Sequence, residues 1–95
     1  MKLVGRKILY DYKEKHSDSK LHIASWEAEV EEAQWNTPHE LKLRYPKASI
    51  LGNLRVVFDI CGNRYRLLTI VNYKNQIVFV EKIGTHKEYD KWKLG

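Results

Sequence analysis

Hydrophobic residues in the first half of the chain recur at the spacing of a helix. Within Lys20–Trp35 the apolar positions follow one another at steps of three and four residues: Ile23, Trp26, Val30 and Ala33. Such positions form one stripe of a helix, and this stripe is expected to face the core. Three glutamates fall largely outside it: Glu27, Glu31 and Glu32. A shorter helix with a similar face is predicted for Arg6–Lys15, after a short strand at residues 1–5.

Polar residues mark where the predicted helices begin and end. The cluster Ser17-Asp18-Ser19 can end the first helix and cap the second. Thr37 can accept hydrogen bonds from first-turn amides, Pro38 suits the first helical position, and Glu40 completes a capping box. Together they predict a third helix, which Pro46 stops because the residue before a proline is pushed toward extended geometry.

The second half of the chain consists of short runs rich in Val, Ile, Phe and Tyr. We predict strands at four of them: Ser49–Leu51, Arg55–Ile60, Tyr65–Tyr73 and Ile77–Ile83. Short turn signals separate these runs, so consecutive strands should pair as an antiparallel meander. A short polar helix is predicted within His86–Trp92. Helices first and strands afterwards indicate an α+β fold, with the helices on one face of a mainly antiparallel sheet.

Length and composition predict one small globular domain. The chain has 95 residues, 43% hydrophobic and 31% charged, which fits a single domain over residues 1–95. The lone cysteine, Cys61, excludes an internal disulfide framework, and the histidines lack metal-ligand spacing, so we expect no metal and no cofactor. No apolar run approaches the length of a membrane span or a secretory signal, which favours an intracellular protein without a membrane partner.

The charge of the chain is concentrated in its second half. Residues 1–41 have six basic and eight acidic side chains, whereas residues 42–95 have eleven basic and four acidic ones. A basic half of this kind is typical of proteins that bind a polyanion, nucleic acid first. A solvated Lys/Arg surface without a partner has the same composition, so both interpretations stay open.

Several of these basic residues fall on the predicted strands. Arg64 and Arg66 lie two residues apart and therefore point to the same side of a strand. Arg55 and Lys82 lie near the ends of neighbouring strands. They could form a cationic face on the side of the sheet that the helices leave open, or serve as edge charges that prevent aggregation.

The segment after the last strand, Gly84–Lys91, combines a histidine, a phenol and two lysines. Scission of RNA needs a base for the 2′-OH proton, a donor for the leaving 5′-oxygen, and cations for the charge of the phosphorane. His86, Tyr89 and the lysines suit this chemistry, although a solvated helix end has the same composition. The other histidines are expected to be ordinary surface residues: His16, His22 and His39.

Four segments in this order resemble HigB-type toxins of the RelE superfamily of ribosome-dependent mRNA interferases: Ala48–Asn53, Arg55–Ile60, Gly62–Leu67 and Gly84–Asp90. The resemblance implies a RelE-like α+β fold and a cytoplasmic bacterial toxin of a type II toxin–antitoxin system, which cleaves mRNA in the ribosomal A site. It also implies a HigA-like antitoxin with a helix-turn-helix that represses its own promoter. The toxin would then reach operator DNA only through the antitoxin.

The resemblance also implies roles for individual residues. Arg66 matches the superfamily's arginine that contacts the scissile phosphate, and His86 matches a position that acts on the leaving group or the phosphate. Tyr89 and Lys91 fall where relatives keep an aromatic and a basic residue near the nucleotide. A pair of lysines that some relatives place before the central strand is absent, so the general base is not identified. Candidate RNA-binding residues are Arg55, Arg64, Lys74, Lys82 and Lys87.

Two other interpretations of the same residues remain. The chain could be a non-catalytic nucleic-acid-binding module that uses the basic sheet face, with bases stacked on exposed tyrosines. It could also be an interaction domain whose positive half binds an acidic protein. Only an enzyme would lose RNA cleavage without losing RNA binding when His86 changes, and only an interaction domain would ignore RNA.

Overall fold

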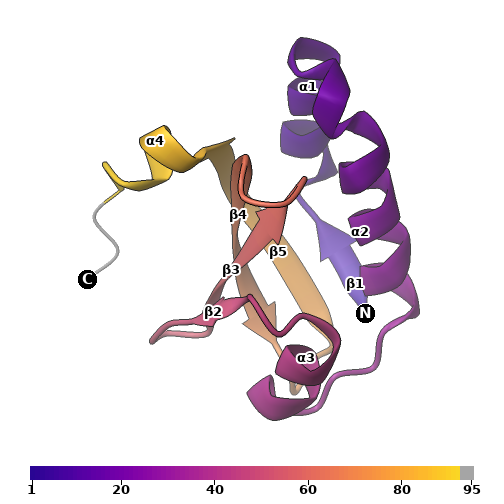
Figure 1. Cartoon of the computed structure of the whole chain (residues 1–95). Coiled ribbons are helices and arrows are strands. Elements are labelled where there is room, and N and C mark those ends of the chain that lie inside the picture. Colours follow the sequence, from indigo (N-terminus) through magenta and orange to yellow (C-terminus); the bar gives the residue numbers. More distant parts are fainter. Residues whose placement is uncertain (93–95) are drawn as a thin grey trace.

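The computed structural model describes residues 1–92, and its central feature is a five-stranded sheet (Figure 1). Its strands are β1 (Lys2–Val4), β2 (Ser49–Ile50), β3 (Arg55–Ile60), β4 (Tyr65–Asn72) and β5 (Ile77–Thr85). Strands β2 to β5 pair antiparallel in chain order, which confirms the predicted meander. The spatial order is β1-β5-β4-β3-β2, because β1 adds to the free edge of β5 in parallel, a pairing that the sequence did not predict.

Within the described residues, four helices and one 3₁₀ turn accompany the sheet: α1 (Arg6–Lys15), η1 (Ser17–Ser19), α2 (Lys20–Glu32), α3 (Pro38–Arg44) and α4 (His86–Tyr89). Helices α1 and α2 cover one face, as predicted, and α4 lies on the other side of the sheet (Figure 1). The predicted α+β fold is confirmed. No helix within residues 1–92 is long and apolar enough to cross a membrane.

The core lies between α2 and the sheet and is centred on Phe58. The predicted stripe of α2 is buried there at Ile23, Trp26 and Val30, and Trp26 meets Phe58 edge to face at 5.3 Å between ring centroids. Tyr45 packs against the same ring at 5.2 Å. Because aromatic pairs of this kind add to the energy of apolar burial, they fix the linker after α3 against the sheet.

Glu27 corrects the predicted pattern of α2, because its side chain is buried rather than outside the stripe. Only 5% of the residue is exposed, and its carboxylate meets Lys13 Nζ at 2.6 Å and Arg6 Nε at 3.4 Å. Both cations come from α1. A buried carboxylate needs such partners, so the contact between α1 and α2 explains the exception.

The helix ends also differ in detail from the prediction. Helix α2 ends at Glu32, and Ala33 already has extended backbone. Ser19 does not cap α2; its hydroxyl donates to the carbonyl of His16 at 2.6 Å, because the chain enters α2 directly from the helical turn η1. At α3, Thr37 accepts from the Glu40 amide at 3.2 Å as predicted, while the Glu40 carboxylate accepts from the Asn36 amide.

Candidate active site

The pairing of β4 with β5 brings Arg66 next to the start of α4. Arg66 lies opposite Gly84, and Tyr65 lies opposite Thr85, in the antiparallel register. A Cβ atom at Gly84 would approach Trp92 to 2.9 Å and Glu88 to 3.2 Å. Glycine is therefore what lets the chain fold back over the end of β5, with α4 directly above Arg66.

Helix α4 is short, and hydrogen bonds in its first turn stabilise it. The hydroxyl of Thr85 accepts from the Glu88 amide at 3.1 Å, and the Glu88 carboxylate accepts from the Thr85 amide at 2.9 Å, which completes a capping box. These hydrogen bonds with Thr85 lower the pKa of Glu88 below its ordinary value. The His86 amide donates to the Arg64 carbonyl at 3.1 Å, which fastens the helix to the turn before β4.

Arg66 is held in place by several groups. Its Nε lies 3.3 Å from a carboxylate oxygen of Asp59, the residue opposite it on β3, and its Nη1 donates to the Asn63 carbonyl at 3.1 Å. Its guanidinium lies over the Tyr89 ring at 5.6 Å. Only 12% of the side chain is exposed. A fixed guanidinium with little solvent around it is well suited to binding a phosphate.

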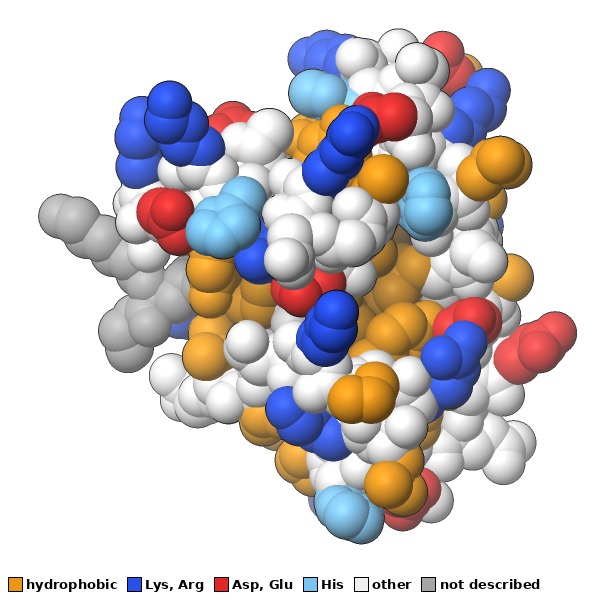
Figure 2. Space-filling view, in the orientation of Figure 1, with side chains coloured by type: hydrophobic (Ala, Val, Ile, Leu, Met, Phe, Trp, Pro, Cys, Tyr) orange, Lys and Arg blue, Asp and Glu red, His pale blue; other side chains and the backbone are white. Residues whose placement is uncertain are grey.

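His86 lies at the surface of the same region, with about half of its side chain exposed. Its Nδ1 is 3.4 Å from a carboxylate oxygen of Asp90, one helical turn further along. Such a pairing orients an imidazole and leaves Nε2 as the nitrogen that can face a substrate. Lys and Arg side chains gather with a histidine at this end of the molecule (Figure 2).

Two aromatic rings continue the candidate active site from α4 toward Lys82 on β5. Tyr89 meets Trp92 edge to face at 5.6 Å, and the Lys82 ammonium lies 4.9 Å from the centre of the Trp92 ring. Lys87 and Lys91 are exposed on and just after α4. The structure therefore brings together six of the predicted site residues: Arg66, Lys82, His86, Lys87, Tyr89 and Lys91.

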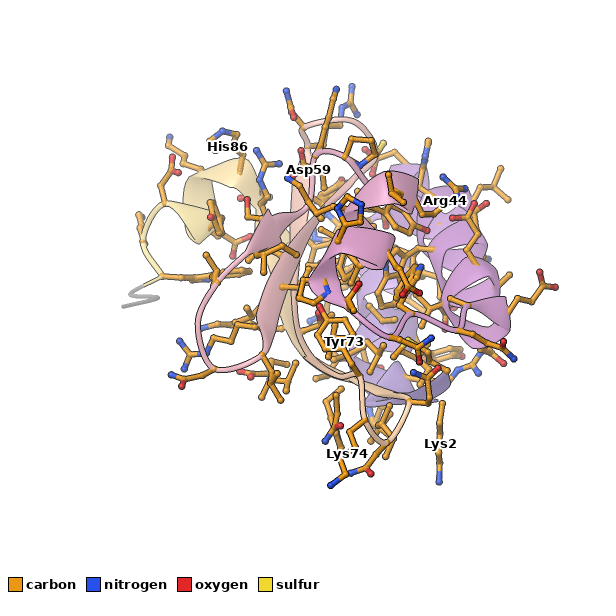
Figure 3. The ribbon with its side chains drawn as sticks, turned by 90° about the horizontal axis from the view of Figure 1, so that it is seen from below. Lys2, Arg44, Asp59, Tyr73, Lys74 and His86 are labelled. Carbon is orange, nitrogen blue, oxygen red and sulfur yellow. The ribbon has the colours of Figure 1, made fainter. Side chains whose placement is uncertain are left out.

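The other predicted site residues lie elsewhere. Arg64 Nη1 forms an ion pair with Asp18 at 2.8 Å, although most of its side chain remains exposed. Arg55 begins β3, four residues from Asp59 along the strand. Lys74 lies in the turn between β4 and β5, at the opposite end of the sheet from His86 (Figure 3).

Asp18 connects the helical layer to this end of the sheet. Its carboxylate accepts from the Tyr65 hydroxyl at 2.6 Å as well as from Arg64. These hydrogen bonds, that from Tyr65 first and that from Arg64 second, hold the pKa of Asp18 below its usual range. Nearby, burial raises the pKa of the Tyr12 phenol to about 12, which keeps this ring neutral where it packs edge to face on Tyr65.

Three neighbours of the predicted residues were not anticipated. Asp59 and Asp90 supply the carboxylates beside Arg66 and His86, and Trp92 supplies the ring beside Lys82 and Tyr89. Of these, only Asp90 had a signal in the sequence, because residues four apart in a helix are neighbours. Within residues 1–92, no group of three or more His, Cys, Asp or Glu side chains could hold a metal ion.

Comparison with known proteins agrees with the fold. Residues 19–92 match the model of the HigB toxin family, described as the RelE-like toxic component of a toxin–antitoxin system. The chain is similar to the mRNA interferase toxin HigB of Escherichia coli K12, with 28% identity over 92 residues, which cover 95% of this chain and 88% of that protein. It is also similar to mRNA interferase HigB of E. coli O6:H1, with 27% identity over 93 residues, which cover 96% and 90%. The family match spans most of the chain, including β4, β5 and α4, and the chain therefore belongs to the HigB family of RelE-like toxins.

Proposed function

We propose that this toxin is an endoribonuclease that cleaves mRNA on the ribosome and thereby inhibits translation. The observation that carries the proposal is the fixed guanidinium of Arg66, which is held by Asp59 and lies over the ring of Tyr89. His86 lies on α4, the same short helix as Tyr89. The relatives named mRNA interferases support it, because the chain covers most of their length.

The proposed reaction is the attack of a ribose 2′-oxygen on the adjacent phosphorus atom. The 2′-hydroxyl loses its proton, the bond between phosphorus and the 5′-oxygen breaks, and the 5′-oxygen takes up a proton. Negative charge develops on the phosphorane between these steps. The contacts of Arg66 within residues 1–92 engage Nε and Nη1, so Nη2 is the donor that we assign to a phosphate oxygen.

We assign the proton for the 5′-oxygen to His86. Its Nδ1 is paired with Asp90, and Nε2 is the nitrogen that can donate. Tyr89 offers a ring on which a base can stack, and Lys87 and Lys91 add positive charge beside the reacting phosphate. Lys82 and Arg64 would extend phosphate contacts along the strand, with Arg55 and Lys74 reached only by a longer stretch of RNA.

We infer a cognate antitoxin as the second partner, because the family is the toxic component of a two-component system. We propose that it is a HigA-like helix-turn-helix protein that neutralises the toxin in the bacterial cytoplasm. Contact of the toxin with operator DNA would then pass through this antitoxin.

The test is cleavage of a reporter mRNA in a translation extract with and without ribosomes, mapped by primer extension. Arg66→Ala should lower cleavage by about 100-fold, the scale on which one preorganised donor acts. Lys7→Ala is the matched control, since Lys7 is an exposed cation on α1 away from this site. Uncut mRNA in the presence of ribosomes and soluble parent protein would contradict the proposal, and equal cleavage without ribosomes would contradict its ribosome dependence.

A further inference from the structure

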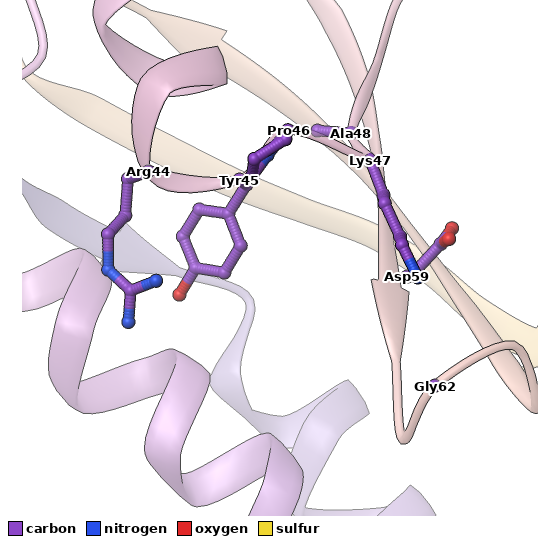
Figure 4. Close-up of a pocket in the computed structure, with 7 residues that line it drawn as sticks. All are labelled: Arg44, Tyr45, Pro46, Lys47, Ala48, Asp59 and Gly62. Carbon is purple, nitrogen blue, oxygen red and sulfur yellow. The ribbon is translucent and has the colours of Figure 1, made fainter.

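A groove lies beside the candidate active site, on the other side of Asp59. It consists of two adjoining cavities of about 290 and 240 Å³, which share Arg44, Tyr45, Asp59 and Gly62 in their walls. We call it the α2–β3 groove, because α2 and the end of β3 bound it. Figure 2 shows the hollow from outside, with hydrophobic side chains at its floor, and Figure 4 shows residues that line one part of it.

The walls of the α2–β3 groove combine flat apolar surface with balanced charge. Tyr45 and Pro46 form an apolar wall, and the Arg44 guanidinium lies over the Tyr45 ring at 5.0 Å. Arg44 and the Tyr45 hydroxyl both bond the Glu29 carboxylate. Lys47 extends along the groove toward Asp59 (Figure 4). Two carboxylates and two cations make the groove nearly neutral, which does not favour a phosphate.

A nucleobase fits this combination better than a phosphate does. A base is neutral, has two apolar faces that stack on aromatic rings and guanidinium planes, and has polar groups along its edge. The carboxylate of Glu29 can accept a hydrogen bond from an exocyclic amino group, as acidic side chains do with cytosine. Uracil has no such group. The lining therefore favours adenine, cytosine or guanine over uracil.

The position of Asp59 connects the groove to the candidate active site. One carboxylate oxygen of Asp59 lies 3.3 Å from Arg66 Nε, while the same residue lines both cavities. A strand with its phosphate at Arg66 would therefore have a neighbouring nucleotide at the mouth of the groove. This continuity favours RNA over a segment of the antitoxin, which would need no access to Arg66.

We infer that the α2–β3 groove binds one amino-bearing base of single-stranded RNA next to the scissile phosphate. The inference rests on the proposed function for its choice of polymer. Binding of a base in the groove would then help to determine which mRNA sequences the toxin prefers. Arg44 and Tyr45 supply the stacking surface, Glu29 supplies the acceptor, and Asp59 lies between the groove and Arg66.

The indole N–H signals of the three tryptophans allow a direct test by NMR with the full chain. Trp26 lines the groove, and Trp92 lies beside Tyr89 and Lys82. Trp35 is buried and lines neither cavity, although its ring meets that of Tyr45 at 6.0 Å between centroids. The ligands are 2′-O-methyl hexanucleotides of A, C or U, which bind without being cut because the attacking hydroxyl is blocked. The Trp26 and Trp92 signals should both shift with A and C, and the Trp26 signal should respond several-fold more weakly to U.

Ser25→Tyr fills the groove from α2, and Ala28→Tyr is the matched control, since both residues are exposed on α2 and Ala28 lines neither cavity. Ser25→Tyr should raise the Kd for the A and C oligonucleotides by about 5-fold or more, the low end for losing one stacked base. Ala28→Tyr should leave the Kd within about 2-fold of the parent value.

The outcomes separate this inference from the proposed function. A shift of Trp92 without a shift of Trp26 would overturn the groove as a base site and leave the RNA-binding active site intact. Silence of both signals would count against both proposals. An equal response of Trp26 to U, or a response that Ser25→Tyr does not weaken, would also overturn the inference. A Trp26 shift caused only by purified antitoxin would assign the groove to that protein instead.

Discussion

At the scale of single residues, His86 has the geometry of a proton donor. Its Nδ1 is paired with Asp90, its backbone amide is fixed to the Arg64 carbonyl, and about half of its side chain is open to solvent. An imidazole nitrogen that carries a proton can give it to a leaving oxygen, and an imidazolium can hold a phosphate oxygen. These two roles predict different responses to substitution.

We expect His86→Gln to lower cleavage of a normal phosphodiester by about 100-fold or more, as for the loss of a general acid. A substrate with a 5′-thio leaving group needs no proton, so its cleavage should be largely restored in this variant. The measurement is single-turnover cleavage of matched oxygen and sulfur substrates. Strong activity of His86→Lys together with poor rescue by sulfur would instead assign His86 a purely electrostatic role.

The sequence indicated the candidate site residues better than it indicated the residues that hold them in place. Arg66, His86 and Tyr89 followed from the resemblance to a known family, and the structure brings them together. Asp59 was not predicted, because its place beside Arg66 depends on the register between β3 and β4. Register is set by side-chain packing across the whole sheet, which no local pattern contains.

At the scale of helices and strands, Gly84 is the position that places α4 over the sheet. Gly84→Ala puts a Cβ atom 2.9 Å from the Trp92 ring and 3.2 Å from the Cβ of Glu88, so the Trp92 side chain and α4 must give way. We expect cleavage to fall by about 10- to 100-fold, because small displacements of catalytic groups are costly. Gly52→Ala is the control, since a Cβ there meets nothing within 4 Å. Equal cleavage by the two variants, with unchanged circular dichroism, would show that the position of α4 is unimportant.

The contact between α1 and α2 depends on Glu27 and its two cations. Replacing one partner of a buried ion pair leaves the other uncompensated, so Glu27→Gln should lower the free energy of unfolding by about 2 kcal/mol. Glu31→Gln, at an exposed glutamate that also pairs with Arg6, should cost less than about 1 kcal/mol. Urea denaturation of both variants measures the difference. Equal losses would mean that burial of Glu27 has no energetic consequence.

Most element bounds could be predicted because they depend on local chemistry. The limits of α1 and β3 agree with the prediction, and Thr37 with Pro38 marks the start of α3. The burial of Glu27 could not be predicted from its own helix, since the cations that compensate it come from α1. The pairing of β1 could not be predicted from its own residues either, because its parallel partner β5 lies more than seventy residues away along the chain.

At the scale of the whole molecule, Asp18 joins the helical layer to the sheet beside the candidate active site. Its carboxylate accepts from Tyr65 and Arg64, and the backbone of Arg64 in turn receives the His86 amide. The pKa of Asp18 is lowered by the hydrogen bonds from Tyr65 and Arg64. A group whose pKa is lower in the folded state stabilises the fold above its unfolded pKa, and that contribution disappears as the pH falls through the folded pKa.

We therefore expect Asp18→Asn to be less stable than the parent at pH 7 and at pH 5, where the parent carboxylate is charged in both states. The difference should shrink below about pH 4, the usual pKa range of aspartate, as the parent carboxylate takes up a proton. Thermal unfolding midpoints at pH 7, 5 and 3 measure this. Asp11→Asn serves as the control, because Asp11 pairs only with its helical neighbour Lys7 among the contacts of residues 1–92. A difference between parent and Asp18→Asn that stays constant down to pH 3 would mean that the Asp18 charge does not hold the two layers together.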